Sequence, residues 1–545
     1  MNNQKNTLVF SFLLFLFLCV FFKSLGLWLN INLSHDDLYF RLAFVIVALF
    51  MFQSLGDKKS KITVSLFFAI LVFLSFWINS FLLDVSFDGN WYQKEAILQM
   101  AKGWNPYLSP ALNPADAPSA SQWINYYGKG TWLFGSLIYN IFGRIELGKA
   151  YNLILIFAVY FVTVSCLQMV LKTRKNLSWI IALFCALSPV AIYQMFTYFV
   201  DGQMASLIAC VFLFLFLVFK TESRISYLGL VASVVMLINT KATGLVYGVV
   251  ALGGATVFSF LFRREIFKNI FKASILIGIV GVIMGYNPYI TSLQRYGSPF
   301  YPFSSGYSFS GVTPPGALIY DHLPEKYKPM NRFQKLAHSL FSASGFAEEP
   351  HLKIPFTIEK GEAGRFWNND FRYGGFGPLF SGALILSLGL FIYLGQKLSR
   401  REASILVYFP VSVIIFSTLL NPEACWARYA PQVYLLAPYA LILALFYFPK
   451  GKIFAAILGV LLMINCEAIL ENNLRYEIGL SSGLDKILYN LRGKSIIVDF
   501  GIFRALRVRL DEYGIKYTEV TGTKDRGVQG GTRLGYEMTI FEKIP

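Results

Sequence analysis

Long apolar runs make up most of the chain, and short polar connections separate them. Thirteen runs approach the roughly 20 residues that an α-helix needs to cross the hydrocarbon core of a bilayer. Every backbone N–H and C=O group in hydrocarbon must be hydrogen-bonded within the spanning structure, and the runs lack the alternation of barrel strands, so we expect helices. The predicted spans are 8–29, 41–56, 62–83, 147–171, 177–196, 203–219, 225–240, 243–262, 270–290, 377–395, 404–420, 433–449 and 453–470.

Positive charge is concentrated in alternate connections between these runs. Lys and Arg are frequent in 57–61, 172–175, 220–224, 263–272, 397–402 and 450–452. Short basic connections face the cytoplasm by the positive-inside rule, which predicts a cytoplasmic N-terminus and, with an odd number of spans, an outer C-terminus. Because topology accounts for most of the net charge of +17, we expect no nucleic-acid partner.

The composition agrees with a polytopic membrane protein. The chain has 545 residues, of which 55% are hydrophobic and 14% charged, and this excludes an ordinary soluble enzyme and a disordered chain. We therefore expect an all-α integral protein, placed in the bacterial inner membrane and in contact with the lipid bilayer. Cysteines and histidines show no ligand spacing, so no metal site and no cofactor are predicted, although a divalent metal stays possible.

The remaining polar residues lie mostly in three segments on the predicted outer side: 84–146, 291–376 and 471–545. We divide the chain into a transmembrane domain, 1–470, and a small outer α/β segment, 471–545. Within the latter, 494–500 is predicted to be a strand, 503–513 a helix ended by Gly514, and 515–520 a second strand.

The first outer segment begins with SFDGNWYQKEAILQMAKGWNPYL, residues 86–108. A helix over 89–102 would place Asp88, Tyr92, Glu95 and Gln99 on one face and apolar side chains on the other, as in a helix lying in the membrane interface. Asp88 would then be directed at the outer aqueous space. The alternative is that Asp88 only caps the N-terminus of this helix. A second interfacial or re-entrant helix is predicted over 133–142, which is too short to span.

An acidic residue just after an early span, the pattern D-x-x-x-Y-x-x-E-A-I followed by G-W-N-P-Y, the return Gly128-Lys129-Gly130 and a short second helix resemble the first outer loop of GT-C superfamily glycosyltransferases. The resemblance extends through 239–244, 287–289 with 297–302, 373–378 and 422–429. It departs from the family in having two helices before the one that leads into the loop, and in having Gly89 where a second acid is usual.

The resemblance implies an inverting glycosyltransferase that uses a polyprenyl-phosphate-linked sugar donor and a lipid, polysaccharide or protein acceptor. An outer-loop Asp would act as the general base, and Asp88 is the preferred candidate. The pair Asp36 and Asp37, in the preceding outer connection, is the alternative, because it looks like the paired acidic motif of the family.

A phosphate leaving group needs cations nearby. Lys241 is the sharpest candidate because it lies between two apolar runs, although a lysine that extends to the lipid headgroups is the alternative. Arg428 either holds phosphate or pairs with Glu423. Asp201 and Asp370 are possible acceptor contacts. The predicted substrate-binding residues are Tyr92, Glu95, Lys129, Lys241, Arg295, Arg372, Glu423 and Arg428.

Two other classes of function remain open. A transporter or flippase of lipid-linked glycans would have inverted repeats, broken helices and charges near the bilayer midplane. A glycan ligase or polymerase outside GT-C would have an arginine-rich outer loop and no acidic first loop. Here the ionisable residues gather at the ends of the apolar runs, which favours the glycosyltransferase.

Overall fold

A computed structural model describes residues 2–31, 35–171, 175–301, 323–346, 349–520, 532–534 and 538–542. Within these ranges, ten helices or helix pairs are long and apolar enough to cross a membrane. They are α1 (Asn2–Trp28), α2 (Asp36–Ser54), α3 (Lys58–Phe81), η3 with α7 (Ile145–Val170), α10 (Asp201–Thr221), α12 (Ala242–Phe262), α13 (Arg264–Met284), α17 (Phe380–Lys397), α18 to α19 (Arg400–Leu420) and α21 (Gly451–Asn490).

The other three predicted spans are helical but shorter. They correspond to α8 (Lys175–Ala186), α11 (Arg224–Thr240) and the run Pro431–Tyr447, which contains η9 and α20. The prediction of one continuous span over 177–196 is wrong. α8 ends at Ala186, and Ser188 starts a new helix, α9 (Pro189–Gln194), by accepting a hydrogen bond from the backbone N–H of Ala191. Proline at the first position of α9 is compatible with a helix start but not with a helix interior.

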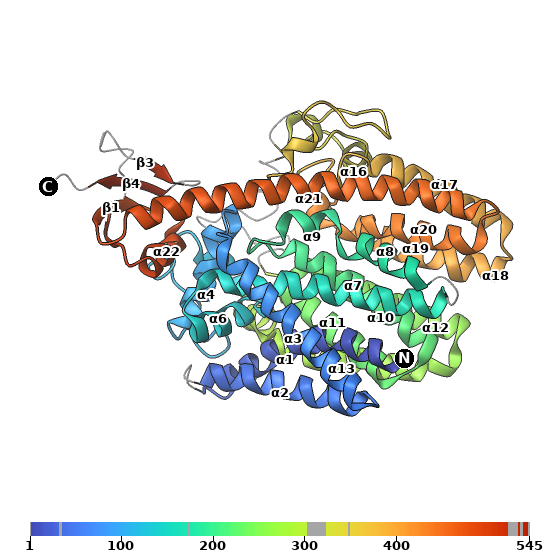
Figure 1. Ribbon diagram of the computed structural model, residues 1–545, viewed down its shortest axis with the longest axis horizontal. Coiled ribbons are helices and arrows are strands. Elements are labelled where there is room, and N and C mark those ends of the chain that lie inside the picture. Colours follow the sequence, from blue (N-terminus) through green and yellow to red (C-terminus); the bar gives the residue numbers. More distant parts are fainter. Residues whose placement is uncertain are drawn as a thin grey trace.

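The buried centre of the bundle consists of α1, α7, α10 and α11. α1 packs against α7 and α11, and α10 packs against α7 and α11. In contrast, α2, α3, α12 and α13 leave most of their apolar side chains uncovered by protein, as expected of helices that face lipid. The helices lie side by side along the long axis of the molecule, with α18 near one end and α4, α6 and α22 near the other (Figure 1).

The first long loop is folded into short helices that pack against the rest of the protein. It contains η2 (Gly89–Gln93), α4 (Lys94–Ala101), α5 (Ser121–Tyr126) and α6 (Gly130–Phe142). The predicted helix is present, but the prediction that its polar face is exposed to water is wrong. Tyr92, Glu95 and Gln99 are as buried as the apolar side, because α6 and the C-terminal end of the chain cover the helix.

The second long loop follows α13 through η4 (Tyr286–Ile290) and α14 (Thr291–Tyr296). It continues with η5 (Glu325–Tyr327), α16 (Arg332–Leu340) and η6 (Ala363–Arg365) before α17. Residues 302–322, which include the stretch Thr313-Pro314-Pro315-Gly316, lie outside the described residues. The described part of the loop is irregular and folds over the ends of the bundle helices.

The chain ends in a small sheet that α21 carries. The predicted strand–helix–strand unit is confirmed: β1 (Ser495–Asp499) pairs in parallel with β2 (Lys516–Glu519), and η10 (Arg504–Leu506) and α22 (Arg507–Glu512) connect them. β4 (Met538–Glu542) pairs antiparallel with β1, and β3 (Thr532–Leu534) pairs with β4, giving the order β2-β1-β4-β3. We call the described residues from 491 onward the C-terminal segment. The division predicted after residue 470 falls inside α21, which runs the length of the bundle to reach the sheet (Figure 1).

Candidate active site

Five charged residues from five different helix ends meet at one end of the bundle. Asp88 follows α3 and precedes η2, Asp201 begins α10, and Lys241 joins α11 to α12. Asp370 precedes α17, and Arg428 lies in η8 (Ala427–Tyr429), between α19 and α20. Successive spans alternate in direction, so these connections all reach the same face of the bundle. We call the five residues the Arg428 cluster.

Arg428 is the centre of this cluster. Its Nη1 lies 2.9 Å from Oδ2 of Asp201 and 3.7 Å from Oδ2 of Asp88, and its Nε lies 2.6 Å from Oδ1 of Asp370. The guanidinium also packs over the rings of Phe199, Trp426 and Tyr429 and is nearly buried. A planar group with several fixed donors suits contact with several carboxylates at once. Burial opposes the charged form, but the neighbouring acids prevail and raise the pKa of Arg428.

The two interpretations of Arg428 made from the sequence have different outcomes. The pairing with Glu423 is wrong, because Glu423 lies 3.4 Å from Nζ of Lys335 on α16. Arg428 is instead occupied by aspartates, so any contact with phosphate would have to compete with these contacts. From the sequence, Asp201 and Asp370 were predicted only as possible contacts of the acceptor. In the structure both aspartates contact Arg428 and belong to the cluster.

Lys241 reaches the cluster from the turn between α11 and α12. Its Nζ lies 2.7 Å from Oδ1 of Asp201 and 4.3 Å from the centroid of the Tyr429 ring. The side chain is therefore held within the protein and does not extend to the headgroups. Burial lowers the pKa of Lys241, and Asp201 partly offsets this effect. About 15% of the Lys241 side chain remains exposed, compared with 7% of the Arg428 side chain.

Asp88 is the most loosely held acid of the cluster. Its nearest partner is the hydroxyl of Tyr92, which donates to Oδ2 at 3.0 Å, and 19% of its side chain is exposed. The alternative that Asp88 is an N-cap is not supported, because its side chain makes no capping hydrogen bond. The pKa of Asp88 is raised to about 6 as the net result of several effects. Burial raises it most, Arg428 lowers it, and Asp370 and Asp201 raise it. Such a carboxylate is ionised near neutral pH and retains an appreciable affinity for a proton.

Several predicted site residues lie away from the cluster. Glu95 accepts hydrogen bonds from Gln99 and from Arg507 of the C-terminal segment. Arg295 is exposed, and its guanidinium lies 3.5 Å from the carbonyl oxygen of Ser109.

Two further predicted cations sit nearer the protein interior. Lys129 is fully buried, donates to the carbonyl of Tyr127 and has a pKa that burial lowers strongly. Arg372 stacks on Phe346 and Trp426, and burial lowers its pKa while Asp370 opposes this. Because Trp426 also packs on Arg428, Arg372 borders the cluster.

The alternative acids are engaged elsewhere. Asp36 forms a buried ion pair with Lys23 of α1, at 2.6 Å, and accepts from Asn140 at the end of α6. Asp37 is exposed and pairs with Arg41, one turn along α2. No described contact joins either residue to the Arg428 cluster.

Tyr92 was predicted as a site residue, but its aromatic neighbours Trp123 and Tyr127 were not. The ring of Tyr92 stacks on Trp123 at 5.6 Å and contacts Tyr127 at 5.5 Å. These rings fix the hydroxyl that contacts Asp88. A sequence signal was present in the high density of Trp and Tyr between 91 and 132, but nothing in that density says which rings meet.

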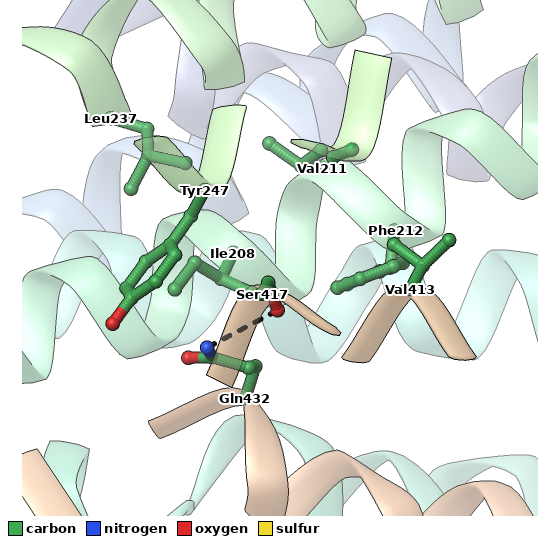
Figure 2. A pocket seen from close by; sticks show the side chains of 9 residues that line it. Ile208, Val211, Phe212, Leu237, Tyr247, Val413, Ser417 and Gln432 are labelled. Carbon is green, nitrogen blue, oxygen red and sulfur yellow. Dashed lines mark hydrogen bonds between the residues drawn. The ribbon is translucent and has the colours of Figure 1, made fainter. Parts of the chain in front are cut away.

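A narrow apolar crevice lies beside the cluster, between α10, α11, α12 and α19. Its wall contains Ile208, Leu237, Tyr247 and Val413, and a hydrogen bond from Gln432 to Ser417 closes one side (Figure 2). The hydroxyl of Tyr247 donates to the carbonyl of Tyr429, which connects the crevice to η8. The crevice lies among spanning helices and is lined almost wholly by apolar side chains.

In the part of the chain that the structure describes, no group of three or more His, Cys, Asp and Glu side chains is arranged to hold a metal ion. The three aspartates of the cluster converge on a guanidinium. Of the histidines, His322 lies outside the described residues.

No protein-family model matches the chain, and a search of curated proteins finds no match. The site therefore has to be interpreted from its own geometry.

Proposed function

We propose that this protein is an integral membrane glycosyltransferase that transfers a sugar from a polyprenyl-phosphate-linked donor to an acceptor hydroxyl, with Asp88 as the general base. The observation that carries the proposal is the position of Asp88. It is a partly exposed carboxylate with a pKa of about 6, beside cations and at the end of a bundle of spanning helices. A lipid-linked substrate reaches such a place from the bilayer, and a polar acceptor reaches it from water.

The chemistry requires one proton acceptor and one stabilised leaving group. Asp88 would take the proton of the acceptor hydroxyl as its oxygen attacks the anomeric carbon. The bond from that carbon to the phosphate oxygen would break, and the polyprenyl phosphate would leave with the electron pair. Attack from the side opposite the phosphate inverts the anomeric centre.

The preference for Asp88 over its neighbours follows from how tightly each acid is held. Asp201 and Asp370 lie 2.9 Å and 2.6 Å from Arg428, whereas Asp88 lies 3.7 Å away. A close guanidinium stabilises the ionised form of a carboxylate and makes it a weaker base. Lys241 is the cation of the cluster that we assign to the donor phosphate, because its side chain is 15% exposed whereas that of Arg428 is 7% exposed, and Arg372 borders the same place.

The acceptor is a lipid, polysaccharide or protein hydroxyl. The charges of the cluster gather at helix ends, not along the interior of the spans, and this supports a transferase over a transporter or flippase. A ligase outside GT-C would also fit the membrane fold, but it gives no role to Asp88.

The test is Asp88→Asn in the full-length protein, assayed in proteoliposomes for sugar transfer from a polyprenyl phosphate donor. Asparagine is nearly isosteric but is not a base, so we expect transfer to fall by roughly 10²- to 10⁴-fold. Asp116→Asn is the matched control, because Asp116 is an exposed acid in the same loop.

Three results would count against the proposal. Full activity of Asp88→Asn would remove Asp88 as the base, and loss of activity on Asp37→Asn instead would favour the pair in the earlier connection. Movement of intact donor across the bilayer without transfer would favour a flippase.

A further inference from the structure

The connection between α3 and η2 is held by the far end of the chain. Leu83 and Val85 insert into a hydrophobic core that the end of α21 and the C-terminal segment form together, among Leu484 of α21, Leu510 and neighbouring apolar side chains. The backbone N–H of Leu83 also donates to the hydroxyl of Ser481 on α21, at 2.9 Å. Two alternate residues of the strand-like connection are thus buried in a core that is formed about 400 residues later in the sequence.

The residue between them, Asp84, enters a buried network of charges. Nζ of Lys94 lies 3.7 Å from Oδ2 of Asp84 and 3.1 Å from Oε1 of Glu146. Glu146 also pairs with Lys149 at 2.8 Å and with Arg509 of α22 at 3.0 Å. Every one of these five side chains is at least 90% buried. Removing one member of such a network leaves a buried charge without its partner, which is strongly unfavourable.

Arg509 connects this network to the backbone that carries Asp88. Its guanidinium donates to the carbonyl of Asp84, and Lys94 donates to the same carbonyl at 3.2 Å. Asn90 donates to this carbonyl and to that of Ser86, at 3.2 Å and 2.8 Å. The five residues from Asp84 to Asp88 are therefore fixed at their start by the C-terminal segment and at their end by Tyr92.

A second contact joins the C-terminal segment to α4, the helix that follows Asp88 and η2. Nη2 of Arg507 lies 2.7 Å from Oε1 of Glu95, one turn beyond Tyr92. Oε1 of Glu512 accepts from the backbone N–H of Ile145, at 2.7 Å. The edge-on contact of Phe87 with Phe503, at 5.0 Å between centroids, closes the space between these contacts.

We propose that the C-terminal segment is a positioning element for Asp88, and that Arg509 and Arg507 are its positioning residues. Neither arginine is in described contact with the Arg428 cluster, so each acts through the backbone or helix that presents Asp88 and Tyr92. This inference rests on the proposed function for its catalytic consequence, whereas the anchoring of residues 84–93 is independent of that function.

The experiment compares Arg509→Ala and Arg507→Ala with the wild-type protein. Arg504→Ala is the matched control, because Arg504 belongs to the same segment but pairs within it, with Glu519 at 2.8 Å. A displacement of about 1 Å at the reacting group costs roughly 10²-fold in rate. We expect kcat to fall by about 10- to 100-fold for Arg509→Ala, by less for Arg507→Ala, and KM for the donor to change by less than about threefold.

The anchoring itself is measured without any substrate. Hydrogen–deuterium exchange should show faster exchange in residues 84–93 of Arg509→Ala, and unchanged exchange in α7 and α10, relative to Arg504→Ala. Arg509→Lys should restore part of both the protection and kcat, since a lysine keeps the charge but not the two-sided contact. If Arg509→Ala does not fold, Arg507→Ala with Glu95→Gln provides the test, and their effects on kcat should not add.

The outcomes separate the two proposals. If the wild-type protein transfers no sugar, the proposed function fails, and the exchange data alone decide whether the C-terminal segment anchors the Asp88 connection. If the wild-type protein is active and the arginine variants match it in kcat and in exchange, the positioning inference is overturned. Equal losses in the Arg504→Ala control would also overturn it, because they would reflect general damage to the segment.

Discussion

Asp88 and Asp201 both contact Arg428, yet they differ in how far they are withdrawn from water. The side chain of Asp201 is 1% exposed and is held by Arg428 and Lys241, whereas that of Asp88 is 19% exposed and lies 3.7 Å from Arg428, its nearest cation among the described residues. The same guanidinium thus neutralises one carboxylate firmly and leaves another able to bind a proton. This difference depends on distances of an ångström, which residue identities do not contain.

A stability measurement at several pH values tests the state of Asp88 without any substrate. Its pKa rises from 3.8 to about 6 on folding, so the folded protein binds the proton more tightly than the unfolded chain does. The contribution of this proton binding to the free energy of unfolding is fully present below pH 3.8 and is lost as the pH rises through 6. A rise of about 2 in the pKa lowers the free energy of unfolding by roughly 3 kcal/mol at pH 8, relative to a carboxyl with an unchanged pKa.

Asp88→Asn removes this cost, so we expect its apparent melting temperature in detergent to exceed that of the wild-type protein at pH 8. The difference should shrink as the pH falls through 6 and disappear below pH 3.8, where the wild-type carboxyl is protonated in both states. Asp116→Asn should show no such pH-dependent gain, because Asp116 is exposed. A lower melting temperature for Asp88→Asn at pH 8 would mean that the contact with Arg428 outweighs burial.

At the scale of elements, the apolar runs predicted where helices form but not always where they end. All thirteen runs are helical, and the strand–helix–strand unit near the C-terminus is present, because hydropathy and local patterning determine both. α21 continues 20 residues past its predicted end. Its outer half is more polar than a membrane span, but its buried positions, whether polar or apolar, recur every three or four residues: Asn473, Glu477, Ser481, Leu484 and Leu488.

The site elements were predictable only in part. Asp88, Lys241 and Arg428 were predicted as site residues because they lie at the outer ends of apolar runs, and the structure places all three in the Arg428 cluster. The sequence did not reveal that Glu95 faces Arg507, because that contact joins residues 412 positions apart. Asp84 was missed for the same reason, although the alternation Leu83-Asp84-Val85 was a local sign of a buried, extended connection.

One close approach between elements has a direct test. A Cβ on Gly128 would lie 2.5 Å from the backbone carbonyl of Asn239, at the end of α11 and two residues before Lys241. The first loop and the turn that carries Lys241 thus touch through a glycine with no room for a side chain. Gly128→Ala must push them apart, at a cost of about 1–3 kcal/mol.

We expect Gly128→Ala to lower the apparent melting temperature and to reduce transfer activity by displacing Lys241 relative to Asp88. Gly364→Ala is the matched control, because no atom lies within 4 Å of its added Cβ. Thermal unfolding followed by tryptophan fluorescence measures the first effect. Equal melting temperatures for Gly128→Ala and Gly364→Ala would show that the contact relaxes without cost.

At the scale of the whole molecule, the first loop and the C-terminal segment lie at the opposite end of the bundle from the basic connection that contains α18 (Figure 1). The helices α4 and α6 of the first loop and α22 of the C-terminal segment lie at one end, and α18, in a basic connection, lies at the other (Figure 1). Asp88 of the Arg428 cluster immediately precedes η2 in this first loop. If the positive-inside rule holds, the cluster faces outward, toward envelope acceptors, and the sheet carried by α21 is extracytoplasmic. The direction of insertion therefore decides which substrates are reachable.

Single-cysteine labelling in intact cells tests this orientation. The six native cysteines are all buried, so introduced thiols should be labelled above a low background. Asp116→Cys in the first loop and Lys516→Cys in β2 both replace exposed residues near the cluster end, and Lys59→Cys replaces an exposed residue of a basic connection. We expect a membrane-impermeant maleimide to label the first two in intact cells and Lys59→Cys only after permeabilisation. The opposite pattern would place the Arg428 cluster in the cytoplasm, where donors built on the inner leaflet meet soluble acceptors, and would exclude transfer at the outer face whatever the role of Asp88.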